Sequence, residues 1–161
     1  MAKRTLMDRY LMANPRIRLV FEVSIIIVIG ILGEVFSWKR LPFSPYSNIS
    51  GGIILGLAWF FHESCHKHHR QAHQRSEAIQ EVVTQGIFSK IRHPMYLSLI
   101  MMEFGIAIAW GIIWMLLPVI ASSIFTILTA LREEQFLLEK FGKQYEEYMK
   151  KVPWRMIPKV F

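Results

Sequence analysis

Charged and aromatic side chains gather at two places in this chain, each at one end of an apolar segment. The first group is Arg92-His93-Pro94-Met95-Tyr96, and the second is Arg132-Glu133-Glu134 after the next apolar segment. Ionisable residues at membrane depth are costly to place and mark a functional site by default. An arginine, a histidine and two carboxylates supply both donors and acceptors, so they can bind a ligand that carries a cationic and an anionic group.

The two groups meet if the apolar residues between them form a helical hairpin. We expect helices over 94–110 and 112–130, joined by a tight turn at Gly111. Pro94 suits a helix start, because the first N–H groups of a helix have no intrahelical partner. Antiparallel neighbours return the chain to its starting level. The spacing therefore predicts one cytosol-facing pocket, covered by a loop over 76–93.

The composition is typical of an integral membrane protein. Of the 161 residues, 53% are hydrophobic, and the mean hydropathy is positive at +0.31. A helix needs about 20 apolar residues to cross a bilayer, and four such segments can be drawn, at 19–36, 48–62, 94–110 and 112–130. We expect an all-α integral membrane protein with about four transmembrane helices and a cytosolic amphipathic C-terminal helix within 131–161. The chain is then a single membrane domain.

Basic residues predict the orientation of these segments. They are concentrated in the N-terminal tail 1–18, in the middle segment 67–92 and in the C-terminal tail 131–161. Because Lys and Arg are enriched in cytoplasmic loops, we expect both termini in the cytosol. The net charge of +7 suits anionic lipid headgroups, and we expect no nucleic-acid partner. The short chain favours a prokaryotic plasma membrane over the endoplasmic reticulum.

Ordered motifs in the second half of the chain resemble the isoprenylcysteine carboxyl methyltransferase family. They are Gly86-x-Phe88-x3-Arg92-His93-Pro94-x-Tyr96, Glu133-Glu134, Phe141-Gly142-x2-Tyr145-x2-Tyr148-x3-Val152-Pro153 and Ile157-Pro158. Several ordered motifs at matching spacing are a far more specific signal than one short motif. The related membrane phospholipid methyltransferases share much of this pattern, and the resemblance covers Val82 to Phe161.

This resemblance implies an enzyme that uses S-adenosyl-L-methionine as its cofactor. No Gly-x-Gly-x-x-Gly element follows a strand pattern, so a soluble Rossmann-type methyltransferase is disfavoured. Adjacent helical residues point about 100° apart, so one glutamate of the pair would bind the methionine ammonium, and the choice between the two stays open. The residues that the resemblance places around the cofactor are Gly86, Phe88, Arg92, His93, Pro94, Tyr96, Glu133 and Glu134.

The implied methyl acceptor is a lipidic or prenylated small molecule, reached from the cytosolic leaflet. For the carboxylate of a prenylated cysteine, the leading acceptor, the protein mainly has to position the nucleophile. We expect Arg132 to orient that carboxylate with a forked bond, with Glu134 beside it at the catalytic centre. Relatives often carry an arginine one turn before the glutamate pair, where this chain has Thr129. An amino-lipid or a small thiol is the alternative acceptor, and an amine would need a nearby base.

Two residues within 94–110 are candidates for contact with the acceptor. Glu103 lies seven residues after Tyr96, on the same helix face. It is either hydrogen-bonded to a neighbouring helix or a polar contact in the substrate tunnel, since an intramembrane glutamate is costly without a partner. Ser98 stands where relatives often have glycine, and a larger residue there would narrow the tunnel.

Two interpretations without methyl transfer also fit part of the sequence. His62, His66, His69 and His73 form one helical stripe beside Cys65, and such spacing can bind zinc or nickel. It matches none of the usual zinc patterns, and we expect no metal in the reaction. A non-enzymatic membrane scaffold would explain the hydropathy, but not the convergence of the two polar groups. We expect no specific protein partner.

Overall fold

The computed structural model describes residues 10, 15–68 and 79–161, and this part of the chain is helical. The prediction of an all-α protein is confirmed, because the described residues contain no β-strand. The β-type pairing among them is one isolated bridge between Arg40 and Ile112. The α-helices are α2 (Pro15–Val35), α3 (Tyr46–His68), α4 (Pro94–Trp110), α5 (Leu116–Phe141) and α6 (Lys143–Lys151), with 3-10 turns η2 (Gly86–Ser89) and η3 (Ile113–Met115).

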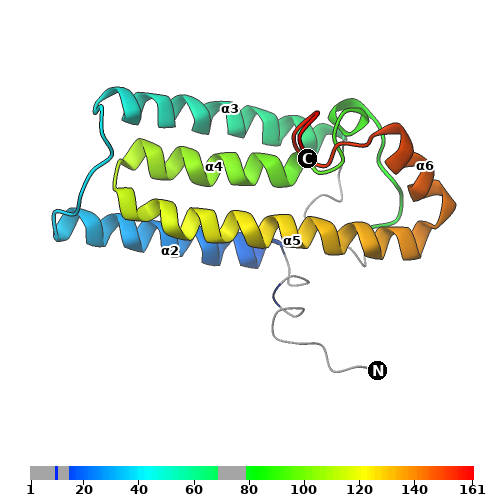
Figure 1. Cartoon of the computed structure of the whole chain (residues 1–161), viewed down its shortest axis with the longest axis horizontal. Helices are drawn as coiled ribbons and strands as arrows, with labels where there is room; N and C mark the ends of the chain where they lie inside the picture. Colours follow the sequence, from blue (N-terminus) through cyan, green and yellow to red (C-terminus); the bar gives the residue numbers. More distant parts are fainter. Residues whose placement is uncertain (1–9, 11–14, 69–78) are drawn as a thin grey trace.

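The four long helices lie side by side in an antiparallel bundle (Figure 1). α2 and α5 overlap in that view, α4 lies between α5 and α3, and α6 stands at the end where α5 finishes. α4 begins at Pro94 and ends at Trp110. The next residue, Gly111, has a φ of +87°, a left-handed conformation that glycine adopts without strain. The chain ends of α3, α4 and α5 that carry the polar groups therefore lie at the same end of the bundle.

Small residues let α3 and α4 approach closely. A Cβ atom added to Gly105 would lie 2.8 Å from the backbone nitrogen of Leu55, and one added to Gly51 would overlap the backbone of Ala109. Close backbone approach at small residues is the usual packing mode of helices in membranes, where burial of apolar surface drives little association. The pair α3–α4 is thus the most tightly packed part of the bundle.

One described segment, Ile113–Phe141, is long and apolar enough to cross a membrane by itself. α4 is also apolar, but with 17 residues it is shorter. α2 has 21 residues and is interrupted by charged residues, two arginines and two glutamates. Four transmembrane helices thus remain a prediction. The side-by-side packing of the four long helices is compatible with it.

The C-terminal part differs from the sequence expectation. We expected a membrane segment that ends at residue 130 and a separate helix after it. Instead, α5 continues without a break to Phe141, because its interior holds neither glycine nor proline beyond Pro118 in its first turn. The chain breaks at Gly142, whose φ is +53°, and α6 follows. Within α6, Tyr145 and Tyr148 are buried.

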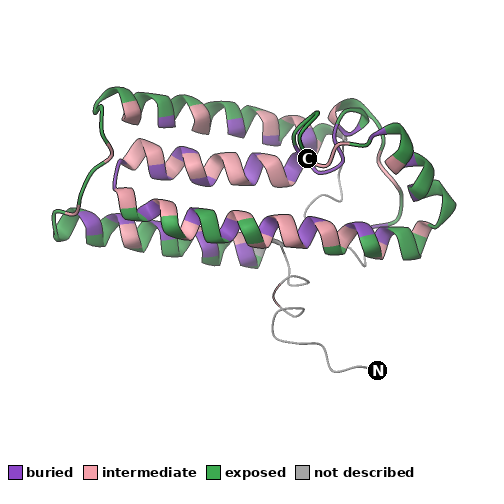
Figure 2. Ribbon diagram, viewed as in Figure 1, coloured by how far each residue is buried: buried purple, intermediate pink, exposed green. Residues whose placement is uncertain are grey.

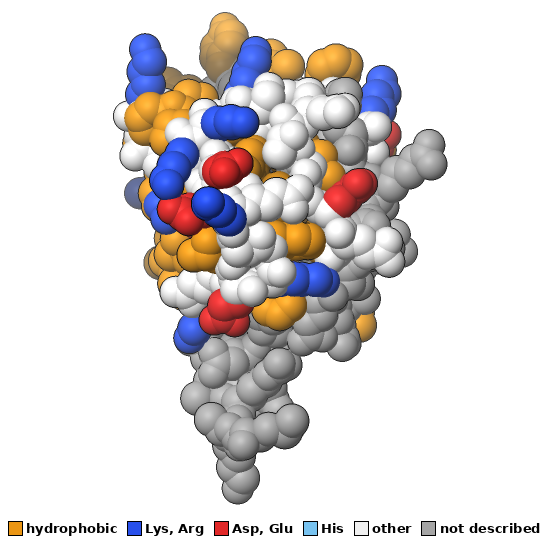
Figure 3. Space-filling view, turned by 90° about the vertical axis from the view of Figure 1, so that its right-hand side faces the viewer, with side chains coloured by type: hydrophobic (Ala, Val, Ile, Leu, Met, Phe, Trp, Pro, Cys, Tyr) orange, Lys and Arg blue, Asp and Glu red, His pale blue; other side chains and the backbone are white. Residues whose placement is uncertain are grey.

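The distribution of buried and exposed residues agrees with the expectation of a membrane protein. Figure 2 shows buried residues on the inner faces of the long helices and exposed residues on the outer faces of α2 and α3. Many exposed residues are large and apolar, among them Val20, Phe21, Ile53, Leu57 and Phe60. Apolar outer faces of this extent mark contact with another apolar phase or partner. The end that carries α6 is different, because Lys, Arg and Glu side chains are spread over it among apolar ones (Figure 3).

Candidate functional site

The hairpin of α4 and α5 brings the two polar groups of the sequence together. The Nε atom of Arg92 donates to Oε1 of Glu134 at 2.8 Å, across 42 residues of sequence. The same carboxylate oxygen accepts from Nε2 of His93 at 3.2 Å. Because a carboxylate only accepts hydrogen bonds, this contact requires the proton on Nε2 of the ring. The convergence predicted from the spacing is therefore present.

Glu134 lies at the centre of a cluster of cationic donors. Its second oxygen, Oε2, accepts from Nε of Arg155 at 2.9 Å. The residue is 4% exposed. A buried carboxylate is costly unless it is fully paired and hydrogen-bonded, and two arginines and a histidine meet this requirement. Glu134 thus joins α5 to the start of α4 and to the segment that follows α6.

Backbone hydrogen bonds tie that C-terminal segment to the start of α4. The amide N–H groups of Arg92 and His93 donate to the carbonyls of Trp154 and Arg155 at 2.9 and 2.7 Å. Nη1 of Arg92 donates to the carbonyl of Val152 at 2.6 Å. The two residues before Pro94 are therefore held on both backbone and side chain, which fixes the direction of the imidazole.

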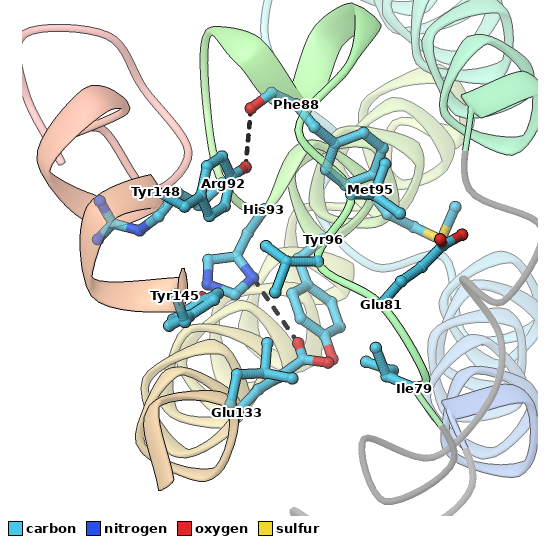
Figure 4. Close-up of a pocket in the computed structure, with 13 residues that line it drawn as sticks. Ile79, Glu81, Phe88, Arg92, His93, Met95, Tyr96, Glu133, Tyr145 and Tyr148 are labelled. Atoms are coloured by element: carbon cyan, nitrogen blue, oxygen red, sulfur yellow. Dashed lines mark hydrogen bonds and ion pairs between the residues drawn. The ribbon is translucent and has the colours of Figure 1, made fainter. Parts of the chain in front are cut away.

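A pocket opens between this cluster, α6 and the segment before η2 (Figure 4). His93 points into it, and Nδ1 of His93 lies 3.7 Å from Oε2 of Glu133. The ring of Tyr96 lies 5.6 Å from that of His93 between centroids, and its hydroxyl end points toward Glu133. The lining residues are Ile79, Glu81, Val82, Val83, Phe88, Arg92, His93, Met95, Tyr96, Glu133, Leu137, Tyr145 and Tyr148.

The pocket offers the donor set that the resemblance requires, on a small scale. A carboxylate, an imidazole and a guanidinium stand beside aromatic walls from Phe88, Tyr145 and Tyr148. The cavity volume is about 80 Å³, below the roughly 300–1,000 Å³ of pockets that enclose a whole ligand. A ligand of cofactor size would therefore extend beyond the cavity that the described residues enclose. Residues 76–78 of the predicted cofactor loop lie outside the described residues.

The two glutamates of the pair have different surroundings. Glu133 lines the pocket, whereas Glu134 is not among the lining residues and is occupied by Arg92, His93 and Arg155. The 100° between adjacent helical residues explains this division. Glu133 is consequently the better placed of the two to meet a ligand ammonium.

The tyrosines of α6 stay protonated near neutral pH. Burial raises the pKa of Tyr145 well above its ordinary value, and the nearby Glu134 and Glu133 charges add to this effect. Burial likewise raises the pKa of Tyr148, whose hydroxyl donates to the carbonyl of Phe88 at 2.7 Å. That bond fastens α6 to η2. Both tyrosines can thus act as walls and donors, but not as general bases.

Three predicted site residues lie elsewhere. Arg132 is exposed, and its Nη1 lies 3.5 Å from Oε1 of Gln135 on the same helix. Glu103 is buried and accepts a hydrogen bond from the hydroxyl of Ser122 on α5. Of the two alternatives for Glu103, this contact agrees with the one in which it is hydrogen-bonded to a neighbouring helix. Ser98 is buried, donates to the carbonyl of Met95 and contacts Nδ1 of His62. The structure does not bring Arg132, Glu103 or Ser98 to the pocket.

The other predicted residues lie at or near the pocket. Pro94 is buried at the first turn of α4, and Phe88 lines the cavity. Gly86 begins η2 with a φ of +61°, a conformation that other residues adopt only with strain. Gly86 therefore shapes the loop that carries Phe88 to the pocket.

Arg155 and Arg18 were not predicted from the sequence as site residues. Arg155 follows Val152-Pro153 in the C-terminal motif, and this position was the available signal for a role at the site. Arg18 is buried in α2, where its guanidinium contacts Glu22, Thr126 and Thr129. Its position in a tail expected to be cytosolic gave no indication of burial.

The histidine stripe is described only in part. Nε2 of His66 lies 3.1 Å from Nε2 of His62, but His69 and His73 lie outside the described residues. Within residues 10, 15–68 and 79–161, no three His, Cys, Asp or Glu side chains are grouped as a metal site. The metal hypothesis therefore gains no support from the described part of the stripe.

Comparison with known proteins agrees with the geometry. The family model for phospholipid methyltransferase matches residues 49–144, which include α4, the Arg92–Glu134 contact and the whole of α5. A curated relative, Delta(14)-sterol reductase TM7SF2 of Mus musculus, is 36% identical over 88 residues, which is 51% of this chain and 20% of the relative. The chain thus spans about a fifth of that relative's length. Because the family model covers more than half of the residues, the chain belongs to the phospholipid methyltransferase family.

Proposed function

We propose that this protein is an integral membrane methyltransferase that uses S-adenosylmethionine to methylate a lipidic acceptor at the cytosolic face. The observation that carries the proposal is the pocket beside Glu133, His93 and Tyr96, in a chain of the phospholipid methyltransferase family. We infer that α2, α3, α4 and α5 cross the membrane. At 1.5 Å per residue α4 is about 26 Å long, close to the roughly 30 Å of a bilayer core.

The chain's own residues would do the binding and positioning. Glu133 would pair with the ammonium of the cofactor, while Arg92 and His93 stay fixed by Glu134. Phe88 and the α6 tyrosines would pack against its apolar and planar parts. When bound, the cofactor supplies a methyl group that its sulfonium activates. The protein's main tasks are then to orient the acceptor and to exclude water.

The acceptor that we favour is the carboxylate of a prenylated cysteine or a similar lipid. A carboxylate is ionised at neutral pH, so its methylation needs no general base. An amino-lipid is the first alternative, in keeping with the name of the family, and a small thiol is the second. The apolar outer faces of α2 and α3 favour any acceptor that partitions into the bilayer.

A reductase is the second candidate function. The sterol reductase is 36% identical to this chain over 88 residues, and a reductase needs a hydride donor such as a reduced nicotinamide. The two functions call for different cofactors. Cofactor binding therefore separates them before any acceptor is known.

Calorimetry of the detergent-purified full chain tests the proposal. We expect saturable binding of S-adenosylmethionine and S-adenosylhomocysteine, weakened at least tenfold by Glu133→Gln, about the effect of one charge-assisted hydrogen bond. Glu146→Gln is the matched control, because Glu146 is exposed on α6 and pairs with Lys150. Binding of a reduced nicotinamide dinucleotide alone would favour the reductase. Binding of no cofactor by folded protein would reject both functions.

A further inference from the structure

A second cavity lies between α2 and α5, apart from the pocket described above. Its volume is about 510 Å³, within the roughly 300–1,000 Å³ of pockets that enclose small molecules. We call it the α2–α5 groove. Its walls are largely apolar and include Phe21 and Ile25 on α2 and Pro118, Ala121, Ser122 and Phe125 on α5.

A buried guanidinium stands at one end of this groove. Arg18 is 5% exposed. Its Nε lies 3.3 Å from Oε1 of Glu22, a groove residue. Its Nη1 donates to the hydroxyl of Thr129, and its Nη2 donates to that of Thr126 at 3.4 Å. Residues of both helices therefore hold the guanidinium in one orientation.

One face of α5 joins the groove, Arg18 and the first pocket. Residues 118, 121, 122 and 125 recur at helical spacing, and the same stripe continues through Thr126 and Thr129 to Glu133. Thr129 precedes Glu133 by one turn, which is about 6 Å along the axis. Glu133 lines the pocket that we assign to the cofactor. Along α5, the order is thus apolar groove, guanidinium and cofactor pocket.

The chemistry of Arg18 suits an anionic group at this junction. A guanidinium has five N–H donors, and contacts to Glu22, Thr126 and Thr129 engage three of them in the described structure. The remaining donors can bind a carboxylate with charge-assisted bonds. Arginine stays charged in proteins, and its N–H groups need an acceptor, which a carboxylate provides and a protonated amine does not.

We propose that the α2–α5 groove binds the apolar chain of the methyl acceptor and that Arg18 positions its carboxylate next to the cofactor pocket. This inference rests on the proposed function and names its acceptor site. Arg18 thereby takes the role that the sequence assigned to Arg132. It binds and orients the carboxylate, and it transfers no proton.

Substitutions of Arg18 test the part of the site that is proposed to bind the carboxylate. The full chain in detergent is loaded with S-adenosylhomocysteine and titrated with a farnesylated cysteine derivative, and KM and kcat are measured with S-adenosylmethionine. We expect Arg18→Gln to raise Kd and KM by about ten- to a hundredfold, the effect of one charge-assisted hydrogen bond. Arg18→Lys should recover part of this loss. The affinity of both variants for S-adenosylhomocysteine should equal that of the wild-type chain. Arg132→Gln is the control, because Arg132 is an arginine of α5 that is exposed and does not line the groove.

Substitutions on α5 test the groove. Ala121→Phe places a ring in the groove and should raise KM for the farnesylated probe at least tenfold. Ile124→Phe adds similar bulk on the outer face of the same helix, where Ile124 is 53% exposed, and should leave KM unchanged. A merely structural role of these residues predicts loss of thermal stability without this difference in KM.

Several outcomes would overturn the inference while cofactor binding stands. These are an unchanged KM in Arg18→Gln, equal effects of Ala121→Phe and Ile124→Phe, and no binding of the farnesylated probe by cofactor-loaded protein. Methylation of phosphatidylethanolamine in place of the probe would also overturn it. Failure of the wild-type chain to bind S-adenosylmethionine is a different result, since it rejects the proposed function itself.

Discussion

Glu134 shows how one residue can organise a site without facing the ligand pocket. Its two oxygens accept bonds from Arg92, His93 and Arg155, which come from the start of α4 and from the C-terminal segment. Truncating one member of a buried charge cluster leaves the others unpaired, which costs more than the pair itself contributes. The adjacent Glu133 lies 3.7 Å from Nδ1 of His93 through its Oε2 atom, and it lines the pocket.

The pair therefore predicts two distinct phenotypes. Glu134→Gln should lower the free energy of unfolding by about 3 kcal/mol, because Arg92 and Arg155 lose a buried counter-charge. Glu133→Gln should change stability by about 1 kcal/mol or less and act mainly on cofactor affinity. Thermal melts in detergent, with and without S-adenosylhomocysteine, measure both effects. The reverse assignment of the two phenotypes would contradict the geometry.

Arg132 provides a second prediction at this scale. Its side chain is exposed and lies near Gln135. Surface substitutions of this kind change stability by about 0.5 kcal/mol or less. Because the side chain also lies away from the pocket, Arg132→Ala should leave kcat and KM within about twofold of wild type, a change of roughly 0.4 kcal/mol. Steady-state kinetics with the farnesylated probe check this. A large loss of turnover would restore the orienting role that the sequence suggested.

Among the helices, α3 and α4 form the closest pair. Gly51 and Gly105 allow their backbones to approach, and the apolar faces that remain are free to meet lipid. The start of α4 carries the catalytic-site candidates, so this packing sets the position of His93. The other elements at the site, η2 and α6, are joined by the bond from Tyr148 to the carbonyl of Phe88.

This packing predicts a contrast between two adjacent glycines of α3. Gly51→Ala should lower the free energy of unfolding by about 1–3 kcal/mol, because its Cβ overlaps the backbone of Ala109 and the helices must separate. Gly52→Ala is the matched control, since a Cβ there meets no atom within 4 Å. It should be neutral or stabilising by up to about 1 kcal/mol, because alanine favours the helix. Equal melting temperatures for the two variants would refute the close approach.

For the whole molecule, the bundle separates two chemically different ends. The α6 end gathers Lys, Arg and Glu side chains (Figure 3), together with the candidate site. At the opposite end, Arg40 in the loop between α2 and α3 forms an exposed ion pair with Glu34 in the last turn of α2. The positive-inside rule assigns the end with more basic residues to the cytosol.

Cysteine labelling can test this orientation, because Cys65 is 0% exposed and should stay silent. Ser44→Cys, in the loop between α2 and α3, should react with a membrane-impermeant maleimide added outside sealed cells. Ser89→Cys, in the exposed part of η2, should react only after the membrane is opened. Both serines are exposed in the structure. Labelling of Ser89→Cys in sealed cells would place the candidate site on the outer side.

Local patterns in the sequence were enough to predict several features. Apolar runs with Pro94 and Gly111 at their ends predicted the α4–α5 hairpin, and this hairpin brings the two polar groups together. The all-α class followed from the same hydropathy pattern. These features depend on near neighbours in the chain, so periodicity and helix-end residues carry the information.

Other features depend on which surfaces pack together, and only the tertiary structure decided them. The continuation of α5 to Phe141 left Arg132 on the outside. Helix geometry then turned Glu133 to the pocket and Glu134 to Arg92, His93 and Arg155. The burial of Arg18 against Thr129 joins residues 111 positions apart. Hydropathy and spacing describe each helix separately, whereas the partner of a buried charge is set by how the helices pack in space.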